Sequence, residues 1–229
     1  MIHIKRVWKD KSNNDAYLKA IIHIDDTDFD VWNNELQILE NKKNIRKTIE
    51  KDSNGDITLW YKVSLQYEYS LCDDRADAFV VALFYFALLS GIDIYSDVAI
   101  SSSLIYQLNV QLIPLLCKKQ KISIVSSILP DLESIGKAVG TGVSCGVDSF
   151  SSIFSGLNDN LPIDKRLTHL TLFNTGSFNF LGYSQVEHLK TWWEEAEREF
   201  NYHIEKGNEL ASKLELGFIC VDSNISDIY

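Results

Sequence analysis

The first third of the chain contains short runs in which apolar and polar residues alternate. The runs that predict half-buried strands are residues 1–8, 17–24, 47–51 and 57–63. Polar residues at 11–15 separate the first two runs, and Asn54-Gly55 lies between the last two. Because Asn and Gly accept the positive φ of tight turns, we expect two β-hairpins in this part of the chain.

Two longer apolar segments follow the hairpins. Residues 78–89 are apolar on every side of a helical projection, which predicts a buried helix that ends before Gly91. The acidic stretch 72–77 is placed to cap this helix and to oppose its dipole. A leucine stripe predicts a second helix over 101–118, with a kink at Pro114.

The pattern changes beyond residue 133, where predicted strands and helices alternate. The predicted strands are 137–143, 167–173 and 216–221, and the predicted helices are 148–157 and 184–212, the latter divided at Gly207-Asn208. Strands separated by helices imply a parallel, right-handed wound sheet. A preceding strand at 121–128 ends about eight residues earlier, which leaves no room for the helix that joins adjacent parallel strands. We therefore expect an α/β fold with a parallel wound sheet in a domain of residues 134–229, preceded by a mixed α+β domain of residues 1–133.

The composition is that of a globular protein with excess negative charge. Hydrophobic residues make up 45% of the 229 residues, the mean hydropathy is −0.08 and the formal net charge is −10. This charge argues against general nucleic-acid binding, because a broad electrostatic contact with phosphates requires a basic surface. The longest apolar run is too short to span a membrane, and the N-terminus has no signal-peptide core. We expect a cytoplasmic protein without membrane contact.

The cysteines indicate neither a zinc site nor a disulfide framework. Cys72, Cys117, Cys145 and Cys220 are widely spaced and form no C-x-x-C pair. Widely spaced cysteines of this kind are typical of proteins in a reducing compartment.

Residues 137–149 carry the most informative pattern in the chain. A β-type run with two glycines leads into the small residues 144–146, and the apolar positions after them share one helical face. This predicts a strand, a tight turn and a helix start, where unpaired backbone N–H groups and the helix dipole favour an anion, and a phosphate above all. A Walker-type loop is excluded because Val147-Asp148 follows Gly146, and a dinucleotide fingerprint is excluded because Cys145 stands where Gly or Ala is required.

The stretch Ser144-Cys145-Gly146-Val147-Asp148-Ser149 resembles the signature Ser-Gly-Gly-x-Asp-Ser of the PP-loop ATP pyrophosphatases. It departs only at Cys145, which stands in place of the first glycine. The resemblance covers about residues 137–224 and implies a Rossmann-like parallel sheet that binds ATP and Mg²⁺.

The resemblance also assigns roles to particular residues. It implies that the phosphates are held by the loop residues Ser144, Cys145, Gly146, Val147, Asp148 and Ser149. Ser144 and Asp148 would also belong to the catalytic machinery. Asn174 and Thr175, which follow the next predicted strand, are implied to help recognise the adenine nucleoside. Asp148 is implied to bind Mg²⁺. Beside a polyphosphate, the carboxylate of Asp148 would repel each phosphate charge by about 1–4 kcal/mol at about 4 Å. A Mg²⁺ ion between the two groups would turn this repulsion into attraction.

The physical argument brings these segments together independently. In a parallel sheet, ligands lie beyond the carboxyl ends of the strands, so Ser144, residues 174–176 and residues 222–224 should meet at one edge.

The resemblance further implies a reaction. PP-loop enzymes cleave ATP between the α- and β-phosphates, join AMP to a carbonyl or carboxylate oxygen and let a nitrogen or sulfur nucleophile displace it. The branch most similar to this chain is that of the 7-cyano-7-deazaguanine synthases, whose acceptor is a small molecule or modified base, although their cysteine-rich zinc segment has no counterpart here. The part before residue 134 is expected to recognise a substrate or a partner.

Three alternatives stay open. The loop could be a plain strand-to-helix turn in a structural interaction protein, since Gly, Ser and Asp are common at such turns. The chain could be a catalytically degenerate nucleotide-binding subunit of a larger bacterial assembly, such as a defence or modification system. Cys145 could be a small filler or a nucleophile activated by His169 or His188.

Few elements follow the loop in the sequence. Two strands can be read after Ser149, and the sequence stops at Tyr229 where another crossover helix is expected. The resemblance therefore predicts a PP-loop domain that is completed by further C-terminal sequence or by a protein partner.

Overall fold

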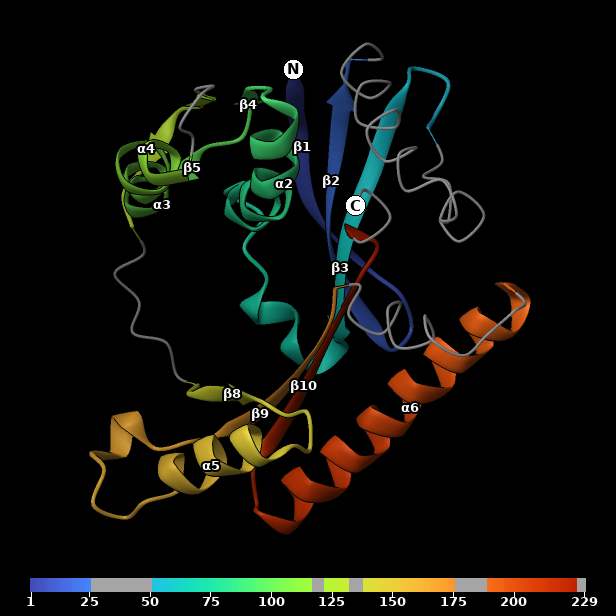
Figure 1. Cartoon of the computed structure of the whole chain (residues 1–229), viewed down its shortest axis with the longest axis vertical. Helices are drawn as coiled ribbons and strands as arrows, with labels where there is room; N and C mark the ends of the chain where they lie inside the picture. The colour runs from blue at the N-terminus through green and yellow to red at the C-terminus, as the bar shows by residue number, and fades with distance from the viewer. Residues whose placement is uncertain (26–50, 117–121, 132–137, 176–188, 226–229) are drawn as a thin grey trace.

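The computed structural model describes residues 1–25, 51–116, 122–131, 138–175 and 189–225, with the backbone alone for 189–193 and 195. The described part is built on one eight-stranded mixed sheet in the order β6-β4-β1-β2-β3-β10-β9-β8 (Figure 1). Its strands are β1 (Ile2–Lys11), β2 (Asp15–Ile24), β3 (Asp56–Ser64), β4 (Ile94–Ser96), β6 (Ile124–Val125), β8 (Gly140–Gly142), β9 (His169–Asn174) and β10 (Gly217–Ser223). A short parallel pair, β5 (Ile100–Ser101) and β7 (Ile128–Leu129), lies beside it. The fold is thus α/β, with a sheet that is partly parallel.

The first three strands form an antiparallel meander. β1 pairs with β2 and β2 with β3, which confirms the first hairpin and the strand predicted at 57–63. Gly55 in the turn before β3 has a φ of 77°, the left-handed conformation expected of Asn-Gly turns, and Lys51 forms a bridge to Ile57. The rest of the strand predicted at 47–51 lies outside the described residues. Every second residue of β2 is buried, so one face of this sheet carries the core.

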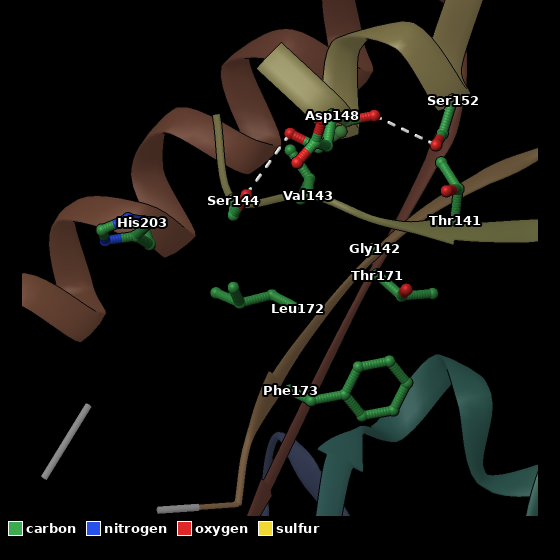
Figure 2. A pocket seen from close by; sticks show the side chains of 11 residues that line it. Thr141, Gly142, Val143, Ser144, Asp148, Ser152, Thr171, Leu172, Phe173 and His203 are labelled. Carbon is green, nitrogen blue, oxygen red and sulfur yellow. Dashed lines mark hydrogen bonds between the residues drawn. The ribbon is translucent and has the colours of Figure 1, made fainter. Parts of the chain in front are cut away.

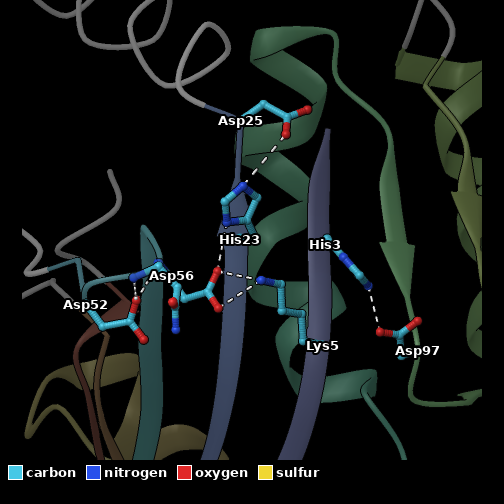
Figure 3. Close-up of polar contacts among 8 residues, drawn as sticks. His3, Lys5, His23, Asp25, Asp52, Asp56 and Asp97 are labelled. Atoms are coloured by element: carbon cyan, nitrogen blue, oxygen red, sulfur yellow. Dashed lines mark hydrogen bonds and ion pairs between the residues drawn. The ribbon is translucent and has the colours of Figure 1, made fainter.

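A polar cluster ties the three strands together on the other face. The buried carboxylate of Asp56 accepts hydrogen bonds from Lys5 Nζ at 2.7 and 2.8 Å and pairs with His23 Nδ1 at 2.7 Å (Figure 3). Burial alone would raise the pKa of Asp56, but the Lys5 and His23 contacts outweigh it, so its pKa lies below the ordinary value. Each of the three residues comes from a different strand, which fixes the register of β1, β2 and β3.

Helix α2 (Asp77–Ser90) packs on the buried face of the meander. Phe79, Leu83 and Phe86 are fully buried, and the helix ends at Gly91, whose φ is 66°, as predicted. The prediction that α2 is buried all round was wrong, because one stripe of the helix faces away from the sheet. Val81, Tyr85 and Leu89 on that stripe are each about half exposed.

The predicted acidic cap of α2 was also wrong. The residue before the helix is Ala76, which has no side chain to accept a hydrogen bond. Asp74 is instead paired with Arg75, and Asp77 accepts hydrogen bonds from the backbone N–H and the hydroxyl of Ser101. Asp77 therefore links α2 to the start of α3, and from the first turn of α2 it also opposes the helix dipole as predicted.

The helix predicted at 101–118 is present in three continuous pieces. They are α3 (Ser102–Tyr106), a wider π-helical segment (Gln107–Leu112) and α4 (Ile113–Leu116), and residues 117–118 lie outside the described residues. Pro114 has no backbone N–H, and its ring would clash with the carbonyl four residues earlier. The π segment directly before it relieves that clash, so the disturbance predicted at Pro114 takes this form.

The single strand predicted at 121–128 was wrong. The chain forms two separate short strands there, β6 beside β4 and β7 beside β5. Ser126 lies between them, and its hydroxyl donates to the carbonyl oxygens of Val98 and Ser127. The polar pair Ser126-Ser127 thus moves the chain from the large sheet to the small one.

The C-terminal strands are parallel, as predicted. β9 pairs with β8 on one side and with β10 on the other. Helices α5 (Val147–Gly156) and α6 (Leu189–Lys213) both pack on the face that carries Leu170 and Phe218, around buried Val143, Ile153 and Ala211. This core supports the loop at the start of α5.

Helix α6 runs without a break through Gly207, so the expected division at Gly207-Asn208 was wrong. A Cβ atom at Gly207 would overlap the ring of Phe218 on β10. The glycine therefore serves close packing of helix on sheet rather than a turn.

The seam between β3 and β10 joins the two parts of the sheet. Asp222 and Ser223 pair with Lys62 and Tyr61, and the Asn224 side chain accepts from Trp60 N at 2.8 Å and donates to Thr58 O at 2.9 Å. A small core of Ala16, Val63 and Tyr67, with Leu71, Ile219 and Val221 against it, spans the same junction. The sheet is thus continuous across the boundary expected near residue 133, which itself lies outside the described residues, and the N-terminal part is not clearly a separate domain.

None of the helices in the described ranges combines the length and the apolar character that crossing a membrane would require.

Candidate functional site

The loop between β8 and α5 has the predicted form of strand, turn and helix. The N–H of Val143 donates to Thr171 O at 2.9 Å, which holds the loop to β9. The chain turns at Cys145, whose φ of 57° is in the left-handed region, and Gly146 then leads in extended conformation into α5. The first bond of the helix runs from Phe150 N to Gly146 O, so the N–H groups of residues 147–149 have no acceptor within it.

Hydroxyl groups brace this turn. Ser149 is buried and donates to Gly146 O at 2.9 Å, and Ser144 Oγ lies 3.4 Å from Ser149 Oγ. Ser152 donates to the backbone oxygen of Asp148 at 3.0 Å, one turn further along α5. Ser149 therefore maintains the turn, whereas Ser144 and Asp148 are exposed at its mouth.

A cavity of about 620 Å³ opens beside the turn (Figure 2). It is lined by Thr141, Gly142, Val143, Ser144, Asp148, Ser149, Ser152, Thr171, Leu172, Phe173 and His203. This volume is in the range of small-molecule sites. Figure 2 shows Ser144 and Asp148 at the turn, His203 on α6, and Leu172 and Phe173 on β9 with their side chains pointing to opposite sides.

The charge of the cavity is sparse. Among the described residues that line the cavity, the acidic residue is Asp148 and the basic residue is His203. These lining residues include neither Lys nor Arg. Nor do the described residues gather three or more His, Cys, Asp or Glu side chains around a common point that could hold a metal ion. The donors at the turn, one carboxylate and two hydroxyls, fit a Mg²⁺ ion only when phosphate oxygens complete its shell, which is the usual manner of Mg²⁺ binding.

The side chain of Asn174, which the resemblance implies in adenine recognition, lies at the junction between β9 and β10. Its amide nitrogen donates to Asp222 Oδ1 at 2.8 Å, and Asp222 also pairs with Lys62 at 2.8 Å. Burial by itself would lower the pKa of Lys62, but the bond to Asp222 raises it above its ordinary value. The ends of β9 and β10 thus meet as expected, but the Asn174 side chain serves the seam. Thr175 is exposed, and neither residue lines the cavity.

His169, one of the two histidines considered as a base for Cys145, does not reach it. His169 begins β9, at the end of the strand opposite the loop, where its Nδ1 lies 2.8 Å from Thr168 Oγ1 and its ring packs against Tyr67. His188 lies outside the described residues. Another thiol, Cys220, is half-buried in β10, and burial raises its pKa to about 11, which makes it unreactive.

Of the residues that line the cavity, sequence reasoning named only Ser144, Asp148 and Ser149; Phe173 and His203 are among those that it missed. Phe173 is the next-to-last residue of β9 and is 52% exposed, which is unusual for a large ring at the end of a buried strand. His203 lies in the middle of a long polar helix, without a motif around it. Only the packing of α6 beside β9 brings it to the loop.

We expect Cys145→Gly to preserve the loop and Cys145→Val to damage it. A residue with a Cβ pays about 1–2 kcal/mol in the left-handed region, which a glycine avoids at an entropic cost of about 0.5–1 kcal/mol. The glycine variant should therefore unfold within about 1 kcal/mol of the wild type and bind nucleotide at least as well, whereas the β-branched valine should lose more than 1 kcal/mol. Urea unfolding measures both. Lost turnover with normal ATP affinity in Cys145→Gly would instead identify Cys145 as a nucleophile.

Comparison with models of protein families, with curated proteins and with solved structures finds no match to this chain.

Proposed function

We propose that this chain is an ATP-binding protein of the PP-loop type, which cleaves ATP to AMP and pyrophosphate in order to adenylate a carbonyl or carboxylate oxygen. The observation that carries the proposal is the form of residues 140–156. The stretch that resembles the PP-loop signature makes a turn with a left-handed residue at the position of the signature's first glycine, and its helix start faces a cavity of nucleotide size.

The residues at the turn would take the phosphates. The N–H groups of 147–149, which have no acceptor within the helix, and the helix dipole would meet the phosphates at this turn. The Ser144 hydroxyl donates to Ser149 Oγ at 3.4 Å in this structure and would turn to donate to a phosphate. Asp148 would help to hold a Mg²⁺ ion that comes with ATP, and the cation would supply positive charge to offset the negative charge of the phosphates. Ser149 would act indirectly, because its hydroxyl already holds the turn through Gly146 O.

The apolar part of the cavity suits a nucleobase. Phe173 offers an exposed ring on the face of β9 opposite Leu172, and Gly142 on the neighbouring strand has no side chain to obstruct a flat ligand. Stacking on such a ring contributes about 1–3 kcal/mol per base in other nucleotide sites. Asn174 and Thr175 follow Phe173 directly, so the adenine role implied by the resemblance would fall to their backbone groups.

The acceptor in this proposal is a small molecule or modified base, and the nucleophile that displaces AMP is a nitrogen, as in the 7-cyano-7-deazaguanine synthase-like branch. A second candidate is a nucleotide-binding subunit without turnover in a larger assembly. One observation favours it: the described lining of the cavity has no Lys or Arg to stabilise the charge on departing pyrophosphate.

Calorimetric titration with ATP and Mg²⁺, followed by a pyrophosphate-release assay with candidate acceptors, tests the proposal. Binding with release supports the enzyme, and binding without release supports the subunit. Absence of binding leaves the loop as a strand-to-helix turn in an interaction protein and overturns both.

We expect Ser144→Ala and Gly146→Val each to weaken ATP binding, the valine more. The alanine removes one hydrogen bond, about 0.5–3 kcal/mol. At Gly146 an added Cβ would lie 3.5 Å from Ser144 Oγ, so the backbone accepts it, but the branches of valine would crowd the approach of phosphate. Gly146→Ala is the matched control with an intermediate effect. Equal ATP affinity in all four proteins, measured by calorimetry, would contradict this use of the loop.

A further inference from the structure

We propose that two copies of this chain associate through the open edge of β8, so that the two β8 strands pair antiparallel and the two α5 helices pack beside them. β8 is the last strand of the described sheet, and α5 lies next to it (Figure 1). The inference goes beyond the proposed ATP binding and does not depend on it.

The backbone of β8 directs two residues towards the open edge. Val143 N donates to a carbonyl oxygen of β9 at 2.9 Å, and Val139 O accepts from the first residue of β9 at 3.1 Å. Alternate residues of a strand bond to the same neighbour, so the N–H and C=O groups of Gly140 and Gly142 point away from β9. Both glycines are exposed, and none of the described strands pairs with this side of β8.

This short strand is complementary to itself. β8 reads Gly-Thr-Gly, so a two-fold axis through Thr141 places Gly140 of one copy opposite the partner's Gly142. Each such pair would exchange two backbone hydrogen bonds, and the two Thr141 residues would face each other as a non-hydrogen-bonded pair. Strand edges are commonly protected from such pairing by charged residues or proline, and neither occurs in residues 138–147.

Helix α5 adds an apolar stripe on the side of this edge. Val147 and Phe154 are 86% and 68% exposed, and Phe150, which stacks on Phe154, lies between them on the same helical face. Ser152 lies on the opposite side of α5 and lines the cavity together with His203 of α6. Because α6 packs over β9 and β10 while α5 packs over β8, the stripe faces away from α6 and towards the open edge.

The charge distribution favours a second copy as the occupant of this surface. Residues 138–157 include one charged side chain, that of Asp148, which lines the cavity, whereas the whole chain carries a net charge of −10. Two copies of an acidic protein repel each other, and this repulsion is weakest where both surfaces lack charge. Depletion of charged residues is also typical of the centre of protein interfaces.

The test is the mass of the chain in solution, measured by sedimentation over a range of protein concentrations. β8 is only three residues long, so we expect a weak dimer with a Kd of about 1–100 µM. The mass should rise from 26.1 kDa towards twice that value across this range. Unfolding measured well below it reports the monomer alone. A wild type that stays monomeric far above this range would overturn the inference.

Phe154→Glu should abolish the dimer, because it places a charge from each copy in an uncharged interface. Leu115→Glu is the matched control, since Leu115 is 70% exposed on α4, in the other part of the sheet. It should leave the dimer unchanged. A dimer that is lost in Leu115→Glu and kept in Phe154→Glu would place the interface on α4 and overturn the inference.

Thr141→Cys tests the register of the two strands. The Cα atoms of a non-hydrogen-bonded antiparallel pair lie about 4.5 Å apart, within the range that a disulfide spans. Oxidation with diamide should therefore link this variant into a covalent dimer, and adding Phe154→Glu should prevent the link. The wild type, with its exposed Cys145, gives the background. A wild type that dimerises while Thr141→Cys links no more than this background would overturn pairing through β8.

Discussion

Replacing Asp148 by asparagine should change ATP affinity in opposite directions with and without Mg²⁺. The carboxylate stands at the first turn of α5, exposed at the mouth of the cavity. Without the cation it repels the phosphates by about 1–4 kcal/mol at about 4 Å, so the asparagine variant should bind metal-free ATP more tightly. If Asp148 holds Mg²⁺ as proposed, the same variant should bind ATP·Mg²⁺ more weakly and lose pyrophosphate release.

Calorimetry in EDTA and in Mg²⁺ measures the reversal. Asp164→Asn is the matched control, because Asp164 is exposed in the short turn before β9 and contacts only Lys165 among the described ion pairs. It should change neither affinity by more than a small factor. If Asp148→Asn weakened binding equally in both buffers, Asp148 would serve as a helix-capping residue and not as a metal ligand.

Truncating a large buried side chain in either of the two main cores should shift one common unfolding transition. Phe79→Ala empties the core under α2, at a cost of about 3–5 kcal/mol, and Leu170→Ala empties the core under α5 and α6, at about 2–5 kcal/mol. The seam joins these cores through the Lys62–Asp222 pair, the Asn224 bridge and the small core around Tyr67. Each variant should therefore lower the urea midpoint seen by every probe.

The measurement compares tryptophan fluorescence with far-UV circular dichroism in urea. Phe154→Ala, which removes an exposed ring from α5, should change the free energy of unfolding by no more than about 0.5 kcal/mol. Two separate transitions, each shifted by only one of the core variants, would show instead that residues 1–133 and 134–229 unfold as independent domains.

Local signals were sufficient to predict the loop and the elements around it. The alternation in β1 and β2, the end of α2 at Gly91 and the sequence of strand, turn and helix over 140–156 all depend on residues within a few positions of one another. The backbone preferences of glycine and the periodicity of apolar residues determine structure over a few neighbouring residues, so these features can be predicted from the local sequence. The α/β class and the parallel pairing of β8, β9 and β10 followed from the same signals.

Features that depend on distant contacts could not be read in this way. Gly207 has the sequence context of a helix break, but the Phe218 ring opposite it requires a residue without a side chain. Ser126 and Ser127 fall inside the run that predicted a single strand. Only the pairing of β6 with β4 and of β7 with β5 shows that the chain divides at these serines. In both cases the decisive neighbour is far along the chain, and its identity is absent from the local pattern.

The sequence by itself determined the strand, turn and helix start around Ser144–Ser149, because the turn and the helix start are encoded in six adjacent residues. Only the tertiary structure shows what surrounds that loop. His203 and Phe173 line the cavity beside it, the Asn174 side chain bonds to Asp222 at the seam, and β10 pairs with β3. Strand order and helix packing are set by the burial of apolar surface over the whole molecule. That burial is the sum of many weak contacts between residues remote in sequence, which no short stretch contains.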